Sequence, residues 1–353
     1  MLVHIIFFLI SILALARSFP IQLHKISITP LQSSITRRHS NHIVLHGHKC
    51  TNFQTASASI VGQDPDSAGK VNQDACFHFT TSGNRFICGG VLDGHGKKGH
   101  VLNHFLEVHL AQLLQCYLEK ETHTTPDSIP NILVKSFEEA HYAARMNEAV
   151  PAGRSGTTCV VTIIDVINGL IYAGNVGDSR AIIAIDIANV DEDGGDAALV
   201  MALSTETTTA IEDERKRIQS GEGRIDGSGN VWYGPVGIAS TRALGDSVMS
   251  RAGVIPTPQV TTFDLIQEVT KEGNRSSCDC RVLIGSDGIF DVLGNEEANE
   301  LLCNIMKTSD RLSLEAGCNM LVQEARRKWQ NELPVEVRID DTTVVAIEFT
   351  VTI

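Results

Sequence analysis

The sequence predicts an α+β fold in which antiparallel β-sheets pack against helices. Short runs of β-branched and apolar residues recur along the 353-residue chain. The helical segments are clustered between groups of these runs and do not alternate with them one for one. Strict alternation would favour a parallel sheet, whereas clustering favours antiparallel sheets covered by helices. No internal repeat or long low-complexity linker follows Asp64, so we expect one domain over residues 63–353.

Six runs have the composition and length of strands. They are residues 86–92, 158–165, 170–176, 180–187, 281–285 and 342–349. The second and third runs are separated by a turn centred on Asn168 and Gly169. Asn-Gly between two apolar runs is a strong hairpin signal, so we expect these two strands to pair.

Helices are predicted where apolar residues recur every three to four positions, because that spacing places them on one face of a helix. The segments with this spacing are residues 101–117, 132–146, 296–306 and 312–329. The acidic stretch DEDGGD, residues 191–196, is expected to be a solvated loop, because its ligand spacing matches no known calcium cage.

The N-terminus has the composition of a targeting sequence. Residues 1–16 contain an apolar run that ends in Ala-Leu-Ala, which predicts a signal peptide; a non-cleaved anchor is the alternative, because no Lys or Arg precedes the run. Residues 17–62 are basic, rich in Ser and Thr and free of Asp and Glu, as in an organelle transit peptide or a disordered segment. Together they resemble the two-part plastid presequence of algae with secondary plastids. We therefore expect entry into the secretory route and import into a plastid, with secretion or an endomembrane location as the alternative.

Charge excludes some partners. The formal net charge is -13, and the five Lys and Arg before Asp64 leave 24 bases against 42 acids from there on, a balance of -18. A body with this charge repels nucleic acid and anionic membranes, so we expect neither as a partner once the presequence is removed.

The nine cysteines do not predict a disulfide framework, because their number is odd and the chain is long enough to form a core. Cys76, Cys88 and Cys159 lie in strand-like runs, where a thiol is a small core residue. Cys278 and Cys280 form a CxC that we expect on a loop as a pair of surface thiols, with a redox or metal site as the alternative.

Aspartates recur at the ends of the predicted strands, beside glycine or in short loops. They are Asp74, Asp93, Asp178, Asp287 with Asp291, and Asp340 with Asp341. A single such aspartate is usually a cap or turn residue. Carboxylates that converge with few His and no Cys repel one another unless hard cations such as Mg²⁺ or Mn²⁺ neutralise them. Two such ions can share a hydroxide and clamp the oxygens of a displacement at phosphorus, which predicts a phosphoester hydrolase.

Nine motifs then point to a family. In order they are VNQDA, VLDGHG, SGTTCVV, AGNVGDSRA, LSTE, IASTRALGD, IPTPQV, LIGSDGIFDVL and DDTTVVAI. The series resembles the successive motifs of the type 2C metal-dependent serine/threonine phosphatases and covers residues 63–349. The resemblance implies a fold of two antiparallel β-sheets packed face to face and flanked by helices, a four-layer αββα sandwich with a metal pair at one end.

The resemblance also implies roles for individual residues. Asp93 matches the carboxylate that bridges both ions, the carbonyl of Gly94 matches a ligand of one ion, and Asp287 and Asp340 match the remaining ligands of the other. His95 falls on the proposed general acid, a role that suits an imidazole because its ordinary pKa lies near neutrality.

Further positions match the surroundings of the ions. Gln73 and Asp74 occupy the places of the acidic pair that holds metal-bound waters. Asp178 and Asp291 match residues associated with a third, weaker ion.

The sequence departs from the family pattern near the substrate. Gly69 stands where many members have an arginine that binds the substrate phosphate, and Lys70 beside it is the candidate replacement. Gln73 replaces a glutamate, and residues 221–238 are expected to form a flap. Lys97 and Lys98 are expected to be solvated residues at the start of a helix.

The function implied is hydrolysis of phosphoserine and phosphothreonine in proteins by a hydroxide that bridges two Mg²⁺ or Mn²⁺ ions. Phosphoproteins are the expected partners, and we expect a monomer. The alternatives are a pseudophosphatase that acts as a regulatory binding module and a hydrolase of small phosphoesters. Asp93, Asp287 and Asp340 are all present, which favours an active enzyme over the first alternative.

Overall fold

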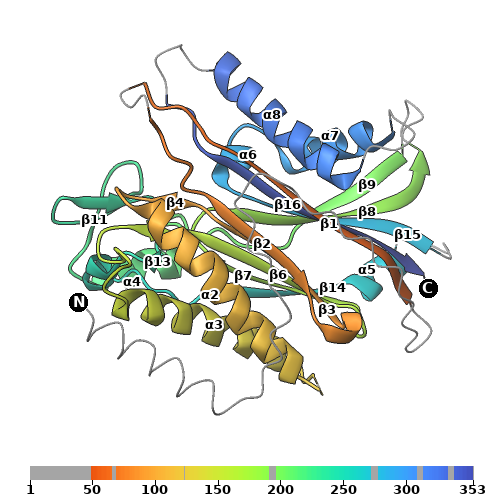
Figure 1. Ribbon diagram of the computed structural model, residues 1–353, viewed down its shortest axis with the longest axis horizontal. Coiled ribbons are helices and arrows are strands. Elements are labelled where there is room, and N and C mark those ends of the chain that lie inside the picture. Colours follow the sequence, from red (N-terminus) through yellow and green to blue (C-terminus); the bar gives the residue numbers. More distant parts are fainter. Residues whose placement is uncertain are drawn as a thin grey trace, which may run out of the picture. The chain divides into compact units, whose positions relative to one another are not determined.

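Two five-stranded antiparallel sheets form the centre of the molecule (Figure 1). The structure is a computed structural model that describes residues 49–65, 69–122, 124–190, 196–271, 277–307, 313–332 and 338–352, all within one unit, Ser34–Ile353. The first sheet has the order β1 (Lys49–Ile60), β16 (Thr342–Thr352), β15 (Ser277–Gly285), β8 (Arg180–Val190) and β9 (Asp196–Ala202). The second has the order β14 (Gln259–Asp264), β7 (Leu170–Val176), β6 (Cys159–Asp165), β3 (Phe86–Leu92) and β2 (Ala75–Thr80).

The two sheets share a core of apolar side chains. Val91 and Val160 from the second sheet and Ile183, Ile284 and Val345 from the first belong to one buried cluster. Strands with apolar residues on both faces, such as β3 and β6, are buried along their whole length because helices cover the outer side. The core therefore fixes the strand ends, from which the polar loops project.

Helices cover the outer face of each sheet, as Figure 1 shows. Helices α2 (Gly99–Lys120) and α3 (Ser128–Met146) pack on the second sheet, and α6 (Asp287–Phe290), α7 (Asn295–Lys307) and α8 (Leu314–Glu332) pack on the first. The apolar stripe of α2 is buried at Leu102, Leu106 and Leu110, as its spacing predicts. The predicted four-layer arrangement is thereby confirmed. None of the helices in the described part of the chain combines the length and apolar character needed to cross a bilayer.

The predicted elements agree closely with the structure. All six predicted strands are present, and β6 pairs with β7 across a turn in which Gly169 has φ 65°, so the predicted hairpin is confirmed. The four predicted helices correspond to α2, α3, α7 and α8. Residues 191–195 of the acidic loop lie outside the described residues, as does the predicted signal peptide.

The prediction that residues 17–62 form a presequence or a disordered segment is wrong for their last part. Residues Lys49–Ile60 form strand β1, which pairs antiparallel with β16. Ala56 and Ala58 are buried, and Ser59 Oγ lies 2.7 Å from Thr343 Oγ1. Small and hydroxylated residues give a transit-peptide composition, yet here they form a closely packed strand, because strand formation depends on the neighbouring strand more than on composition.

The CxC prediction was wrong in its location. Cys278 and Cys280 lie in β15 and not on a loop, and their side chains are 6% and 0% exposed in the core between the sheets. Residues two apart in a strand point to the same face, so both thiols are buried together, with 3.9 Å between their sulfur atoms. Neither is a surface thiol.

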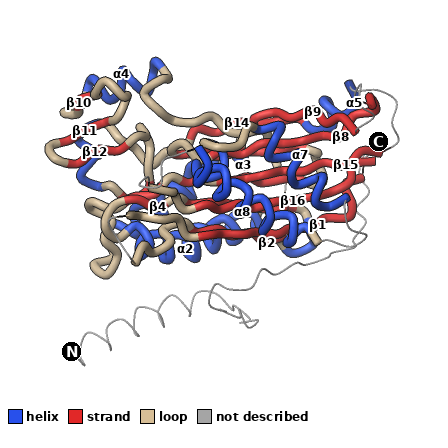
Figure 2. Tube along the Cα trace, turned by 90° about the horizontal axis from the view of Figure 1, so that it is seen from above, coloured by secondary structure: helices blue, strands red, loops and turns tan. Residues whose placement is uncertain are grey.

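Two smaller sheets and a short helix lie at one end of the large sheets. The flap consists of β10 (Arg224–Ile225), β11 (Val231–Tyr233) and β12 (Val236–Ile238), within the predicted segment 221–238. The other small sheet has the order β13 (Leu244–Gly245), β5 (Gly156–Thr157) and β4 (Gly94–His95). Figure 2 shows loops gathered at this end, around β4, β11 and β12. The remaining elements are η1 (Ser82–Asn84), α4 (Glu212–Ser220), η2 (Ser247–Ala252) and α5 (Leu265–Lys271).

A buried carboxylate attaches the flap region to the rest of the fold. Glu214 of α4 is 3% exposed and accepts hydrogen bonds from Arg217, Arg242 and Thr241 at 2.6 Å. Burial opposes ionisation of Glu214, but these donors outweigh it and lower its pKa to about 2. The charged network therefore holds α4 against the segment that leads to β13.

Candidate metal centre and active site

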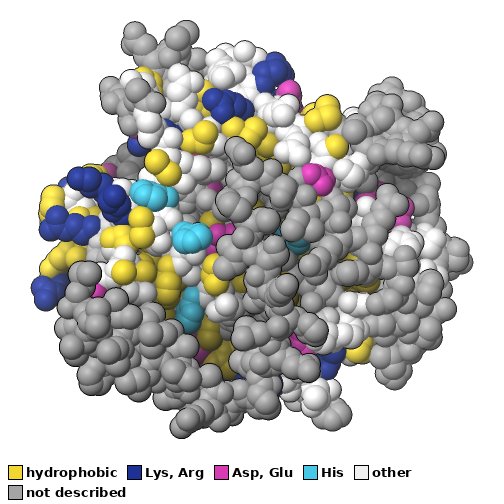
Figure 3. Space-filling model, in the orientation of Figure 1, with side chains coloured by type: hydrophobic (Ala, Val, Ile, Leu, Met, Phe, Trp, Pro, Cys, Tyr) yellow, Lys and Arg dark blue, Asp and Glu magenta, His cyan; other side chains and the backbone are white. Residues whose placement is uncertain are grey.

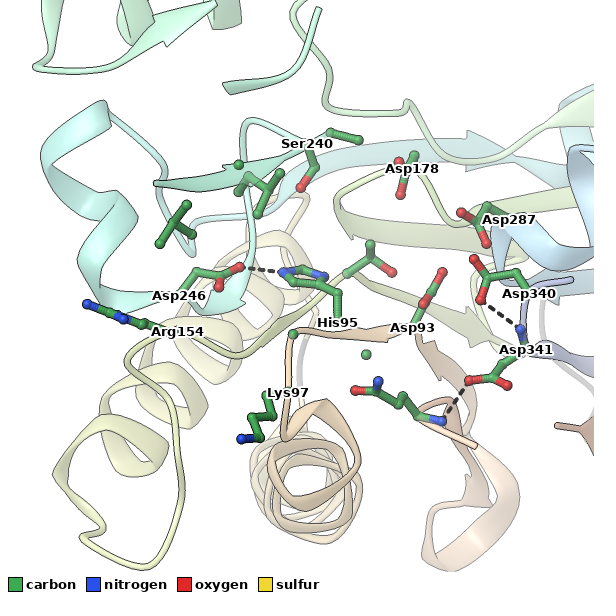
Figure 4. Close-up of a pocket in the computed structure, with 18 of the residues that line it drawn as sticks. Asp93, His95, Lys97, Arg154, Asp178, Ser240, Asp246, Asp287, Asp340 and Asp341 are labelled. Atoms are coloured by element: carbon green, nitrogen blue, oxygen red, sulfur yellow. Dashed lines mark hydrogen bonds and ion pairs between the residues drawn. The ribbon is translucent and has the colours of Figure 1, made fainter. Parts of the chain in front are cut away.

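A cavity of about 1050 Å³ opens at the loop-rich end of the two sheets. Its lining comes from segments that are far apart in the sequence, including the end of β3, the turn before β8, the start of α6, the residues before β16 and the flap. Figure 4 shows acidic side chains pointing into this space from several of these segments. The antiparallel topology thus brings the predicted strand-end aspartates to one place.

Asp93 lies at the end of β3, directly before β4. Its backbone carbonyl accepts hydrogen bonds of 2.9 Å from Thr158 N and from Thr157 Oγ1, which fixes the main chain while its side chain lines the cavity. Gly94 follows, and a Cβ there would lie only 2.5 Å from the carbonyl oxygen of Gln73 and 2.7 Å from Asn103 Nδ2. Only glycine allows this close approach of backbones beside the cavity.

Four predicted carboxylates meet around the cavity: Asp93, Asp178, Asp287 and Asp340. Burial, followed by the charges of Asp287 and Asp74, raises the pKa of Asp93 well above its ordinary value. Burial and the charge of Asp340 raise the pKa of Asp287 to about 8. Burial also raises the pKa of Asp178. Carboxylates with such raised pKa values resist simultaneous ionisation, so a bound cation would stabilise their charged forms.

Some oxygen atoms in the cavity wall and directly behind it lack hydrogen-bond partners. Asp287 Oδ1, Asp74 Oδ1 and Gln73 Oε1 are buried and make no hydrogen bond. A buried polar atom without a partner is costly unless an ion or water satisfies it. The donor set consists of carboxylate, amide and carbonyl oxygens, which are the ligands that Mg²⁺ and Mn²⁺ prefer. The residues therefore fit a hard divalent cation.

The carboxylates do not form a closed cage by themselves. Among the described residues, no three His, Cys, Asp or Glu side chains converge closely enough to hold an ion alone. Ligation would thus draw on main-chain carbonyls and water as well as carboxylates, as is usual for Mg²⁺. Asp93, Asp287 and Asp340 would supply the charge and Gly94 the carbonyl.

The predicted outer residues lie behind this cluster. Asp74 is not part of the cavity wall; its Oδ2 accepts a hydrogen bond of 2.9 Å from Ser286 Oγ, and burial raises its pKa to about 7. Gln73 lines the cavity. Asp291 caps the end of α6, four residues after Asp287, and does not line the cavity; burial and the charge of Asp178 raise its pKa.

His95 has a partner that sequence reasoning missed. Its Nε2 lies 2.5 Å from Oδ2 of Asp246, which is 2% exposed and has the left-handed backbone angles φ 43° and ψ 40°. In Figure 4 the imidazole lies between Asp246 and Asp93. Removal from bulk water lowers the pKa of His95, but the Asp246 carboxylate outweighs this effect, so the pKa is raised.

Glycine at position 156 leaves room for this pair. His95 pairs with Gly156 across β4 and β5. A Cβ at position 156 would collide with the Asp246 carboxylate and lie 2.6 Å from His95 Nε2. Glycine is therefore required at this position of the SGTT motif, because the Asp246 and His95 side chains occupy the space.

Lys70 enters the cavity but its ammonium group is already paired. Nζ lies 3.3 Å from Asp340 Oδ1 and 2.9 Å from Asp341 Oδ1, and donates a 3.2 Å hydrogen bond to the Ile339 carbonyl. Asp341 is buried and also accepts hydrogen bonds from the backbone N–H groups of Gly62 and Gln73, at 2.7 and 2.8 Å. Both aspartates of the DDTT motif line the cavity, but Asp341 is buried and ties segments together, whereas the Asp340 side chain is 47% exposed.

Comparisons with known proteins find similar sequences over most of the chain. The family model "Protein phosphatase 2C" matches residues 74–331. The chain is similar to "Probable protein phosphatase 2C 61" of Arabidopsis thaliana, with 28% identity over 289 residues, 78% of this chain and 80% of the relative. It is also similar to "Probable protein phosphatase 2C 74" of Oryza sativa subsp. japonica, with 30% identity over 263 residues, 73% of this chain and 56% of the relative.

Solved structures share the fold. The crystal structure of a serine-threonine phosphatase 2C from Toxoplasma gondii has a TM-score of 0.66 and 15% identity, covering 90% of this chain and all of that one. A C. elegans sex determining protein has a TM-score of 0.62 and 19% identity, covering 84% of this chain and 64% of that one.

Proposed function

The chain belongs to the protein phosphatase 2C family, whose members are protein serine/threonine phosphatases, and from this premise we propose that it hydrolyses phosphoserine and phosphothreonine in proteins with the help of two Mg²⁺ or Mn²⁺ ions. A third, weaker ion near Asp178 and Asp291 is part of the same proposal. The observation that carries it is the group of half-buried carboxylates around one cavity. The pKa values of Asp93, Asp178 and Asp287 are raised, and Asp287 Oδ1 lacks a hydrogen-bond partner. Such a group is stable in ionised form only around a cation.

The chemistry that such ions supply when bound is a lower pKa for the attacking water and neutralisation of charge on the phosphoryl oxygens. Asp93, Asp287, Asp340 and the Gly94 carbonyl would hold them. Asp74 and Gln73 would accept hydrogen bonds from waters around the ions, because each has a buried oxygen without a partner. Asp178 also lines the cavity and would add a further carboxylate near the ions.

His95 is placed to protonate the leaving group. A carboxylate only accepts hydrogen bonds, so the 2.5 Å contact requires a hydrogen on Nε2 and leaves Nδ1 for the substrate. As the attacking water forms its bond to phosphorus, the bond from phosphorus to the serine or threonine oxygen breaks, and the proton on Nδ1 passes to that oxygen. Asp246 stabilises the charged ring before this transfer and fixes its orientation.

Turnover separates this proposal from its alternatives. Purified protein with Mn²⁺ should release phosphate from phosphoserine and phosphothreonine peptides. A pseudophosphatase would release none from any substrate. A hydrolase of small phosphoesters would act on a panel of small phosphate esters and leave the peptides intact. Light scattering should show a monomer.

We propose that residues 1–48 carry the targeting information, with passage through the secretory route into a plastid. The composition of residues 1–16 and the basic, acid-free segment after them support this route. Because β1 begins at Lys49, the targeting segment should end before it. Residues 1–48 fused to a fluorescent protein should reach the plastid of an alga with a secondary plastid; a secreted fusion protein would contradict the plastid assignment.

A further inference from the structure

Four cationic side chains line the cavity, and they fall into two classes. Lys70 pairs with Asp340 and Asp341, and Arg338 pairs with Asp64 through a 2.9 Å contact. Lys97 and Arg154 are exposed, and no carboxylate within the described residues pairs with either. The second class is therefore available to a ligand.

Lys97 and Arg154 come from two turns that touch. Gly96, with φ 82°, lies so close to the other turn that a Cβ there would be 2.6 Å from the carbonyl oxygen of Arg154. The backbone N–H of Lys98 donates a 3.1 Å hydrogen bond to Ser155 Oγ. Because β4 pairs with β5 beside these turns, the two cations are held on one wall of the cavity. Lys97 is exposed, as expected of a residue at a helix start, and it also lines the cavity.

This wall is opposite the carboxylates. Figure 4 shows Lys97 and Arg154 on the side of His95 and Asp246, and Asp287, Asp340 and Asp341 on the other side. The phosphate that is hydrolysed must lie within reach of the ions, and hence near Asp93 and the carboxylates beyond it. The two free cations are therefore placed to meet a different group of the substrate.

The charge of these turns contrasts with that of the molecule. From Asp64 onward the chain has 42 acidic and 24 basic residues, so an anionic peptide is repelled by most of it. In Figure 3, several other Lys and Arg side chains lie at the left edge of the molecule, where Figure 1 draws β11. On this acidic protein, Lys97 and Arg154 form a local cationic surface that is complementary to a peptide with an anionic group. Binding of that group would also determine the orientation of the peptide.

We propose that Lys97 and Arg154 form a subsite for an anionic side chain next to the phosphorylated residue, so that the protein prefers phosphopeptides with a neighbouring Asp, Glu or second phosphate. An arginine fork binds carboxylate and phosphate oxygens, and a lysine adds a point charge. The inference rests on the proposed phosphatase function and specifies the substrate class for the same site.

The test uses full-length protein with Mn²⁺ and three phosphoserine peptides of equal length whose neighbouring residues are acidic, neutral or basic. A fourth peptide carries a second phosphoserine in place of the acidic residues. The kcat/KM for the acidic peptide should exceed that for the basic one by about tenfold at low salt, and salt should reduce the ratio. The double variant K97E/R154E should bring the ratio to one or reverse it. The fourth peptide shows whether phosphate or carboxylate binds better.

Lys98→Glu is the matched control, because Lys98 is an exposed neighbour that does not line the cavity. This control should keep the wild-type ratio of kcat/KM between the acidic and basic peptides. An equal change of this ratio in K98E would show only a long-range charge effect and would overturn the subsite.

Equal kcat/KM for all peptides in the wild type would also overturn the subsite while leaving the proposed function intact. Turnover of p-nitrophenyl phosphate, which has no neighbouring residue, reports the reaction itself. In K97E/R154E, the loss of p-nitrophenyl phosphate turnover is compared with the loss of acidic-peptide turnover. Equal losses would mean that the two cations bind the scissile phosphate, and this result would exclude the subsite. Phosphate release from no peptide would overturn the proposed function and this inference with it.

Discussion

His95 Nε2 and Asp246 Oδ2 lie 2.5 Å apart although 151 positions separate the two residues in the chain. The Asp246 side chain is almost fully buried and its other oxygen, Oδ1, makes no hydrogen bond. Its backbone is in the left-handed region, which is uncommon for a residue other than glycine. A buried carboxylate in an uncommon backbone conformation that contacts a single imidazole indicates a positioning role for Asp246.

Replacing Asp246 by Asn should weaken protonation of the leaving group. The amide preserves the shape but removes the charge that stabilises the protonated ring, so kcat for a phosphoserine peptide should fall by roughly 10- to 100-fold. The kcat for p-nitrophenyl phosphate should fall much less, because its leaving group needs little protonation. Equal losses on both substrates would show that Asp246 supports the fold and not His95.

Gly156→Ala should disturb the same pair by steric overlap. The added Cβ would collide with the Asp246 carboxylate and lie 2.6 Å from His95 Nε2, so phosphoserine peptide turnover should fall by at least about tenfold. Mn²⁺ binding, measured by calorimetry, should persist. Gly153→Ala is the control, because nothing lies within 4 Å of a Cβ there. Wild-type turnover in Gly156→Ala would contradict the packing.

Asp287→Asn should stabilise the metal-free protein at high pH. The pKa of Asp287 is raised to about 8, so the folded state binds more protons than the unfolded state between about pH 4 and pH 8. Wild-type stability in EDTA should therefore fall as pH rises through this range, and the variant should fall less. At pH 8 the variant should melt roughly 3 °C higher than the wild type in EDTA.

Addition of Mn²⁺ should reverse that order. The ion binds the folded wild type and raises its melting temperature, whereas the variant has lost one ligand and should respond weakly. Asp213→Asn, which alters an exposed carboxylate in α4, should behave as wild type. An equal Mn²⁺ response in Asp287→Asn would remove Asp287 from the proposed ligands.

Glu214→Gln should destabilise the flap region in a pH-dependent way. The pKa of Glu214 is lowered to about 2 in the folded state, so its charge stabilises the fold above the ordinary value of 4.5, and this contribution is lost as pH falls toward 2. Urea unfolding at pH 7 should show a loss of about 2 kcal/mol, which shrinks on acidification to pH 3.

The exposed pair on the same helix provides the comparison. Glu212 binds Arg215 at the surface, where ion pairs contribute little, so Glu212→Gln should cost less than about 0.5 kcal/mol at any of these pH values. A pH-independent loss in Glu214→Gln would indicate altered packing and not charge.

The sequence predicted the elements and the carboxylate cluster because these signals are local. Asp93, Gly94 and His95 belong to one short motif, and a strand end beside glycine indicates a loop that carries functional residues. Asp246 could not be predicted in the same way, because its motif shows an aspartate after glycine but not the side chain that it meets.

Contacts between distant parts of the chain also explain the other two differences between the sequence-based predictions and the structure. Lys70 is adjacent to the position of the expected arginine, but the sequence does not show that Asp340 and Asp341 bind its ammonium group. Residues 49–60 have the composition of a transit peptide, and only pairing with β16 makes them a strand. In both cases a contact across more than 260 residues determines the outcome, and composition carries no record of such contacts.

The position of β16 in its sheet has a consequence for biosynthesis. This strand lies between β1 and β15, and Asp340 precedes it by two residues. A nascent chain can expose Asp93, His95 and Asp287 to the cytosol or lumen while β16 is still inside the ribosome. Until residues 342–352 emerge, β1 has no neighbour in the first sheet and Asp340 is not held at the cavity. The site therefore cannot assemble before β16 has paired with β1 and β15.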